Sequence, residues 1–279
     1  MDILYYLTMA MAMQSTSSSG AAQSQFAPLL PNDFDTSKIS FSDVRTLNNG
    51  GKTVYVNYDG GKFVMQTPWT YTQFGVREPP AEYNDSKTPK FNMEISFANK
   101  GNGQQDPILD TFHQKMKEMD ELLINSACDT KNSFEWLRKK KLTKEICEAL
   151  FTPQVRVSRN SDTGEPTDYP DTMKLKIPYY DGEFKCDLYN PNGELVTDPP
   201  INEAISGRTQ VRCLIQCMGL WFAGGKFGCS WKAFQIEYRP SARLVGYGFR
   251  DDGTKHESVD VVEEDDDEEE DIVDSDIED

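Results

Sequence analysis

The chain has 279 residues and a net charge of −17, but the charge is distributed unevenly. From residue 251 to the end there are 17 acidic residues and one base, so residues 1–250 are close to neutral. No apolar run reaches the 18 or so residues that span a bilayer, so we expect no membrane contact. A body of about 200–230 residues suits one elaborated domain.

Cysteine and histidine usage excludes most cofactor chemistry. None of the six cysteines forms a C-x-x-C pair, and a zinc site needs denser ligand spacing, so we expect no metal. The cysteines are expected to be reduced core residues, which indicates an intracellular protein that is not secreted. Only two histidines occur, His113 and His256, and no phosphate-cradling G-x-x-x-x-G-K-[ST] motif is found. We therefore expect no enzymatic activity and no cofactor.

Residues 1–35 are rich in Ser, Gln and Ala and are predicted to form a flexible segment. The first structured elements are strands over 52–58 and 62–67, joined by a hairpin turn at Asp59 and Gly60. The Pro-rich and aromatic stretch 68–90 is predicted to be a loop. A further strand covers 91–98, where Phe91, Met93 and Ile95 alternate with polar residues.

The hydrophobic period changes to that of helices in the middle of the chain. A helix is predicted over 106–126, with Asp106 as its N-cap and Pro107 in its first turn. A second helix is predicted over 132–150 and carries the basic run 138–141, which is typical of a solvated helix face. The two helices form an insert at about 106–150 on the outside of the fold.

Strands return after Pro153. They are predicted over 154–159, 172–177, 182–190, 209–225 and 226–238, with Val155, Val157 and Leu175 among the inward residues and Lys174 and Lys176 outward. The predicted fold class is mainly β, an antiparallel barrel of OB type with a two-helix insert. The barrel and insert together form a nucleic-acid-binding domain over residues 36–250.

Bases next to aromatic rings recur on the later strands. Single-stranded nucleic acid requires such pairs, because cations follow the phosphates and flat rings stack on unpaired bases. The other interpretation places the bases on a solvated face and the rings in the barrel core. The candidate binding residues are Arg156, Arg159, Lys174, Lys176, Tyr179, Lys185, Arg212, Trp221, Lys226, Phe227, Trp231 and Lys232.

Residues 251–279 form an acidic tail, which we expect to be disordered because like charges without aromatic residues cannot collapse. The tail is either a solubility device or a segment that competes with a polyanion for a basic groove and recruits partners. Its candidate partner-binding residues are Glu263, Glu264, Asp265, Asp266, Asp267, Glu268, Glu269, Glu270, Asp271 and Ile277.

Two sequence segments and the acidic end carry a resemblance to a known family. The segments are IQCMGLWFAGGKFGCSWKAFQIEY and LFTPQVRVSRNSDTGEPTDYPDTMKLKIP. They resemble the single-stranded-DNA-binding proteins of large nucleocytoplasmic DNA viruses, which are similar to the OB-fold proteins of T-odd phages. The resemblance covers roughly residues 40–250 and the tail.

The resemblance implies a monomer or homodimer that coats single-stranded DNA during viral DNA replication and recombination in the host cell. It also implies that the tail contacts the viral DNA polymerase and helicase-primase. The phage tails end in an aromatic residue, whereas this chain ends in Ile277, Glu278 and Asp279. A competing hypothesis is an interaction or chaperone-type protein whose acidic tail binds basic partners and which has no nucleic-acid groove.

Overall fold

The computed structural model describes residues 27–48, 50–79, 89–98 and 106–240, all within one compact unit that ends at Ser241. The acidic tail and residues 1–26 lie outside the described residues. The strands are β1 (Ile39–Phe41), β2 (Arg45–Thr46), β3 (Lys52–Val54), β4 (Val56–Tyr58), β5 (Gly61–Lys62), β6 (Val64–Gln66), β7 (Thr70–Arg77), β8 (Phe91–Ser96), β9 (Phe151–Thr152), β10 (Val155–Arg156), β11 (Thr172–Ile177), β12 (Tyr179–Tyr180), β13 (Glu183–Phe184), β14 (Asp187–Tyr189), β15 (Gln210–Ala223) and β16 (Lys226–Arg239). The helices are α2 (Pro107–Cys128), α3 (Thr130–Leu137), α4 (Lys144–Leu150) and α5 (Ile201–Ala204), with 3-10 turns η1 (Pro31–Asp33) and η2 (Thr36–Lys38).

Five strands close into a ring. β7 pairs with β8, β8 with β11, β11 with β16, β16 with β15, and β15 again with β7. The β11–β16 pairing is parallel, and the other four are antiparallel. The predicted mainly β, OB-type barrel is confirmed, since a five-stranded Greek-key barrel defines that fold.

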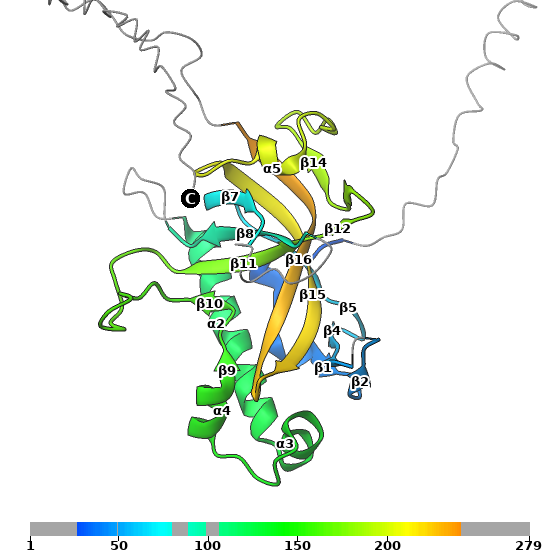
Figure 1. Cartoon of the computed structure of the whole chain (residues 1–279), viewed down its shortest axis with the longest axis vertical. Coiled ribbons are helices and arrows are strands. Elements are labelled where there is room, and N and C mark those ends of the chain that lie inside the picture. Colours follow the sequence, from blue (N-terminus) through cyan, green and yellow to red (C-terminus); the bar gives the residue numbers. More distant parts are fainter. Residues whose placement is uncertain (1–26, 49, 80–88, 99–105, 241–279) are drawn as a thin grey trace, which may run out of the picture. The chain divides into compact units, whose positions relative to one another are not determined.

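The β15–β16 hairpin consists of the two longest strands, as Figure 1 shows, and most of the other strands of their sheet pair with one of them. The outer edge of β15 is shared by β3, β6 and β7, and that of β16 by β9, β11 and β14. Close passage of β3 requires glycine in β15, because a Cβ on Gly219 (φ +100°) would lie 2.4 Å from the carbonyl oxygen of Val54. The register of the hairpin shifts at this point, between Cys217 and Gly219.

The inward strand positions match the sequence prediction closely. Met93, Ile95, Met173, Leu175 and Ile177 are all at most 2% exposed. These side chains belong to one hydrophobic cluster with the buried face of α2. Val157 is the exception, because strand β10 ends at Arg156 and leaves the Val157 side chain 42% exposed.

The predicted loop over 68–90 is wrong in its first half, which forms barrel strand β7. Its inward positions include Thr70 and Thr72, so the strand lacks the usual apolar alternation. Both hydroxyls are satisfied inside: Thr70 Oγ1 donates to the Ser96 carbonyl oxygen, and Thr72 Oγ1 donates to that of Ser206 at 3.0 Å. Burying a hydroxyl group costs little free energy when the group is hydrogen-bonded. The strand can therefore pack in the barrel without an apolar pattern.

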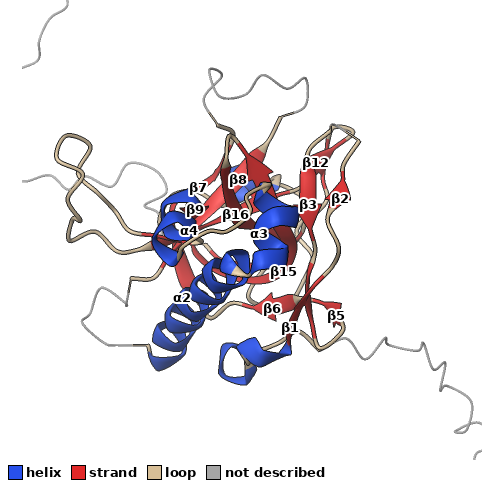
Figure 2. Ribbon diagram, turned by 90° about the horizontal axis from the view of Figure 1, so that it is seen from below, coloured by secondary structure: helices blue, strands red, loops and turns tan. Residues whose placement is uncertain are grey.

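The helical insert consists of α2, α3 and α4, which lie together in front of the strands in Figure 2. Helix α2 begins as predicted, with the Asp106 carboxylate accepting from Ile108 N and Leu109 N. The second predicted helix, over 132–150, is wrong as one element, because Arg138 adopts the left-handed conformation (φ +58°) and ends α3. The break removes four consecutive cations from a helix, where like charges repel. In the described part of the chain, no helix is long and apolar enough to cross a membrane.

The fold begins before residue 36. Residues 27–35 belong to the predicted flexible segment, yet Phe34 is 3% exposed and its ring stacks on Phe63 at 5.3 Å. Leu29 bridges Met65, and Leu29 N donates to the Val64 carbonyl oxygen at 3.0 Å. These residues therefore pack on the outer edge of β6.

Candidate nucleic-acid interface

A cleft of about 270 Å³ lies on the outer face of the barrel. Its walls come from the β9–β10 connection, β10, β11, β15 and β16, which are brought together by the pairings of β16 and β11. The lining contains three cations, Arg156, Lys174 and Lys176, and no carboxylate. It also contains the indole of Trp221.

Strand alternation places the lysines in the cleft. Lys174 and Lys176 point outward from β11 while Met173, Leu175 and Ile177 fill the core, as predicted. On the neighbouring strands Lys176 is registered with Lys232. The sheet thus gathers cations from β11 and β16 on one outer surface.

Glu94 is the acid beside this surface. It is the register partner of Lys174 on β8, and its Oε1 lies 3.4 Å from Arg156 Nη1. Burial, followed by the charge of Arg156, lowers the pKa of Lys174. Burial, followed by the charge of Lys174, lowers the pKa of Lys176. The cleft therefore carries positive charge that one carboxylate does not neutralise.

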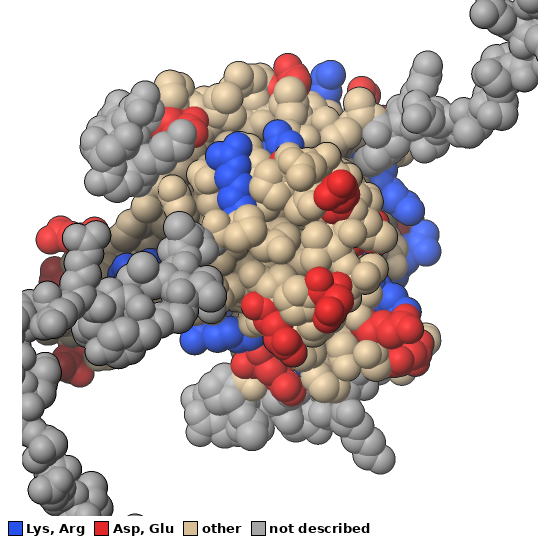
Figure 3. Space-filling model, turned by 90° about the horizontal axis from the view of Figure 1, so that it is seen from above, with Lys and Arg blue, Asp and Glu red and all other residues tan. Residues whose placement is uncertain are grey.

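Charge elsewhere on the unit is mixed. On the face seen from above in Figure 3, Lys and Arg occur in separate groups with Asp and Glu nearby. This distribution agrees with the near-neutral composition of residues 1–250. The excess of cations is a local property of the cleft.

The indole of Trp221 lies over Gly228 of the neighbouring strand β16. Its register partner is Gly228, and a Cβ there would meet Trp221 Cζ2 at 2.8 Å and Cε2 at 3.1 Å. The indole thus rests on glycine backbone, and the side chain is half-buried. One face of the ring is covered and the residue lines the cleft, which is the arrangement that stacks a single base.

Two predicted stacking residues are wrong. Phe227 is 0% exposed, and Trp231, although it lines the bottom of the cleft, is only 1% exposed, so neither ring is free to stack on a base. Phe227 packs on Phe151, and Trp231 packs edge-on against Phe63. Their positions follow from the hairpin register, which turns both rings into the barrel core.

The other predicted residues are spread over the surface. Lys232 is half-buried beside Lys176, and Lys226 is exposed at the tip of the hairpin. Three others lie away from the cleft: Arg159 donates to the Gly164 carbonyl oxygen, Lys185 pairs with Glu183, and Tyr179 packs edge-on against Phe91 and Phe184. Arg212 also lies elsewhere, paired with Glu237.

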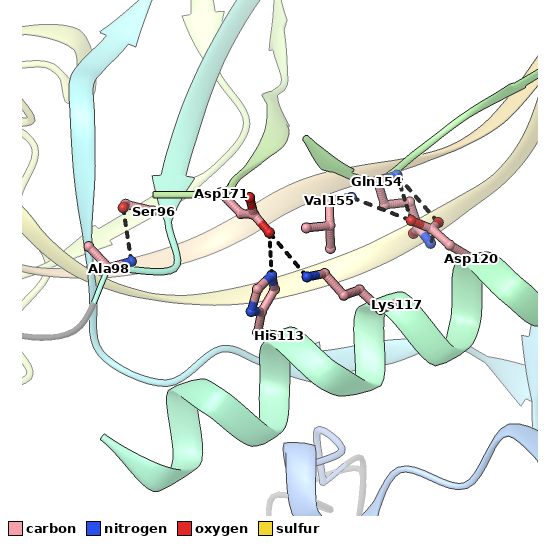
Figure 4. Close-up of polar contacts among 8 residues, drawn as sticks. All are labelled: Ser96, Ala98, His113, Lys117, Asp120, Gln154, Val155 and Asp171. Carbon is pink, nitrogen blue, oxygen red and sulfur yellow. Dashed lines mark hydrogen bonds and ion pairs between the residues drawn. The ribbon is translucent and has the colours of Figure 1, made fainter. Parts of the chain in front are cut away.

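A buried polar network, absent from the sequence prediction, supports the floor of the cleft. Trp231 Nε1 donates to Gln154 Oε1, and Gln154 Nε2 donates to Asp120 Oδ1 at 2.7 Å. Gln154 N also donates to Asp120 Oδ2 at 3.0 Å. Figure 4 shows how Asp120 reaches from α2 to the β9–β10 connection. Burial raises the pKa of Asp120 to about 6.

A second polar contact ties α2 to the start of β11. Asp171 Oδ2 lies 2.8 Å from His113 Nε2 and 3.2 Å from Lys117 Nζ, as Figure 4 shows. Burial, with the charge of Lys117 as the second cause, lowers the pKa of His113. Together with Asp120, this contact fixes the strand that carries Lys174 against the helix.

The network predicts a specific pH dependence. The pKa of Asp120 is about 6 in the folded chain, above its ordinary value of 3.8. The folded state therefore binds this proton more tightly, and stability falls as pH rises from about 4 to about 6. When the pH is lowered from about 7 to about 4, the free energy of unfolding of the unaltered chain should increase by up to about 3 kcal/mol more than that of the Asp120→Asn variant. Urea unfolding of both proteins across this range measures it, and a pH-independent difference would contradict it.

Comparison with known proteins gives likeness only to solved structures. Neither a protein-family model nor a curated protein sequence matches the chain. The single-stranded DNA-binding protein of bacteriophage Enc34, in complex with single-stranded DNA, is 14% identical, with a TM-score of 0.42 over 74% of this chain and 99% of that one. The single-stranded DNA-binding protein gp2.5 of bacteriophage T7 is 11% identical, with a TM-score of 0.40 over 65% of this chain and 93% of that one.

A metal site would require a cluster of side chains that could bind the ion. No group of three or more His, Cys, Asp or Glu side chains among them is placed to hold a metal ion. The polar groups that line the cleft are its three cations, the amide of Gln154, the hydroxyls of Thr152 and Ser230, and the indoles of Trp221 and Trp231.

Proposed function

We propose that the chain binds single-stranded DNA through this cleft and performs no catalysis. The observation that carries the proposal is a lining with three cations, no carboxylate and one half-buried indole. Lys174, Lys176 and Arg156 hold phosphates, while Trp221 stacks on a base. Each stacked base contributes roughly 1–3 kcal/mol and tolerates any sequence.

The position of the cleft on the barrel supports the proposal. In barrels of this type, oligonucleotides bind on the face of the second and third strands and on the loop between the fourth and fifth. Here the second and third ring strands are β8 and β11, and the β15–β16 turn is that loop. The lysines of β11 and Trp221, near the turn, occupy those two places.

The wider role is also a proposal, and it rests on the sequence resemblance. We infer a protein that coats and protects single strands during viral DNA replication and recombination in the host cell. Residues 251–279 compete with DNA for the cleft and recruit the viral polymerase and helicase-primase. The chain's strong charge asymmetry supports the competition, because the tail carries nearly all of the net negative charge.

One binding experiment tests both parts. Full-length protein and a chain ending at residue 250 are titrated with single-stranded and duplex oligonucleotides at about 0.05 M and about 0.3 M salt. We expect both proteins to prefer single strands. We also expect the shortened chain to bind more tightly, chiefly at low salt, because tethering keeps the tail's local concentration near millimolar levels and salt screens its contact with the cleft.

The outcomes separate the two candidate functions. A preference for duplex, or no binding by either protein, rules out the cleft as a single-strand site. Loss of the main binding activity on removing the tail favours the acidic-tailed interaction protein. Equal affinity of the two chains at low salt eliminates competition by the tail but leaves single-strand binding intact.

A further inference from the structure

A second cavity lies near the ends of β15 and β16 that are far from the hairpin turn. Its volume is about 390 Å³, within the range of sites that hold small ligands. Its walls include Trp69, Arg212 and Arg239, the amide side chains of Asn32, Gln66 and Gln210, and the carboxylate of Asp106, which accepts from Ile108 N and Leu109 N as the N-cap of α2. None of these residues lines the cleft described above.

The fold holds Trp69 over the cavity. Trp69 follows Thr67, which is fixed to β15 by two hydrogen bonds: Thr67 N donates to the Cys213 carbonyl oxygen at 2.8 Å, and Cys213 N donates to Thr67 Oγ1 at 2.9 Å. Pro68 is buried directly after this pair. The indole therefore has a defined position above Arg212.

Both arginines stack on this indole. The guanidinium carbon of Arg239 lies 4.1 Å from the ring centroid, and that of Arg212 lies 5.1 Å from it. Arg212 is neutralised by Glu237. Arg239 is exposed, donates to Gln210 Oε1 at 3.2 Å, and has no carboxylate partner among the described residues. The indole thus orders one guanidinium that has no ion pair among the described residues, next to three amide side chains.

We infer that this cavity is a second nucleotide subsite of the same single strand. A guanidinium plane can stack on a base or bind a phosphate, and the amides can bind base edges. Arg212 and Trp221 are nine positions apart on β15, so the two sites are separated by roughly 30 Å of strand. The inference rests on the proposed function and adds a strand-length requirement, because only a long oligonucleotide reaches both sites.

The test uses the full-length Arg239→Ala protein and thymidine oligonucleotides of about 4 and about 20 nucleotides, which lie at the lower limit and above the upper limit of the site sizes of single OB folds. We expect an affinity loss of about fivefold for the long strand at about 0.1 M salt, and a decrease of about 0.7 in its salt slope. The short strand, which fills the first cleft, should bind with unchanged affinity. Arg45→Ala is the matched control, since Arg45 is also exposed and lies 5.5 Å over the ring of Tyr55.

The results decide the inference separately from the proposed function. An unchanged affinity for the long strand would overturn the second subsite, as would an equal loss for both lengths. If the unaltered protein binds neither oligonucleotide, the proposed function itself fails. Binding of both lengths by the unaltered protein, with no effect of Arg239→Ala, removes only the second subsite.

Discussion

Replacing Lys174 and Lys176 together with alanine is expected to weaken binding to single-stranded DNA by about 25-fold at about 0.1 M salt. Each lost phosphate contact reduces the salt slope for single strands by about 0.7, so two contacts remove about 1.4. Because the slope is the change in log affinity per tenfold change in salt concentration, a difference of about 1.4 becomes an affinity loss of about 25-fold between 1 M and 0.1 M salt. Fluorescence anisotropy at several salt concentrations gives both quantities.

The folded state should tolerate the loss of both lysines. The pKa of each is lowered, with burial as the largest cause, so the folded state disfavours their charged forms. Removing the two charges should therefore leave the unfolding midpoint unchanged or raise it. The control is Lys62→Ala with Lys131→Ala, which removes two exposed lysines outside the cleft. A salt slope equal to that of the control would show that the β11 lysines contact no phosphates.

The second large effect is expected at Trp221. Substitution by alanine should cost roughly 1–3 kcal/mol of binding, the contribution of one stacked base. Because an indole contacts no phosphate, the salt slope should stay unchanged, which distinguishes this variant from the lysine variant. Phe74→Ala is the control, since Phe74 is 52% exposed and lies outside the cleft.

Gly228→Ala tests the same stacking without removing the ring. The added Cβ would lie 2.8 Å from the indole and 2.9 Å from the Thr152 carbonyl oxygen, so the ring must leave its place. We expect a loss of affinity in the direction of Trp221→Ala, and the double variant should lose little more than either single one. Fully additive losses would mean that Gly228 acts through the fold and does not position Trp221.

The lysines of the cleft could be predicted because β11 is a regular strand. Its period of two separates Lys174 and Lys176 from the core residues between them, and no bulge disturbs it. The aromatic residues could not be assigned in this way. The register shift between Cys217 and Gly219 interrupts the alternation: both Trp221 and Trp231 line the cleft, but Trp221 is half-buried whereas Trp231 is 1% exposed and packs in the core.

Contacts between residues that are far apart in the sequence could not be predicted either, because they depend on how the elements pack. Asp120 and Gln154 are 34 positions apart and meet only because α2 packs beside the β9–β10 connection. Trp69 lies in a stretch predicted to be a loop, and its partners Arg212 and Arg239 come from the two ends of the hairpin sequence. Strand β7 was missed because it buries hydrogen-bonded threonines where apolar residues are usual.

The closed ring of five strands has a consequence for crowding. If the proposed function holds, copies on one nucleic-acid strand would meet side by side at high local concentration, where free β-edges promote aggregation. In the ring, each strand is paired with a neighbour on both sides. Contacts between adjacent copies are therefore left to side chains and to short outlying strands such as β14, which offers three residues.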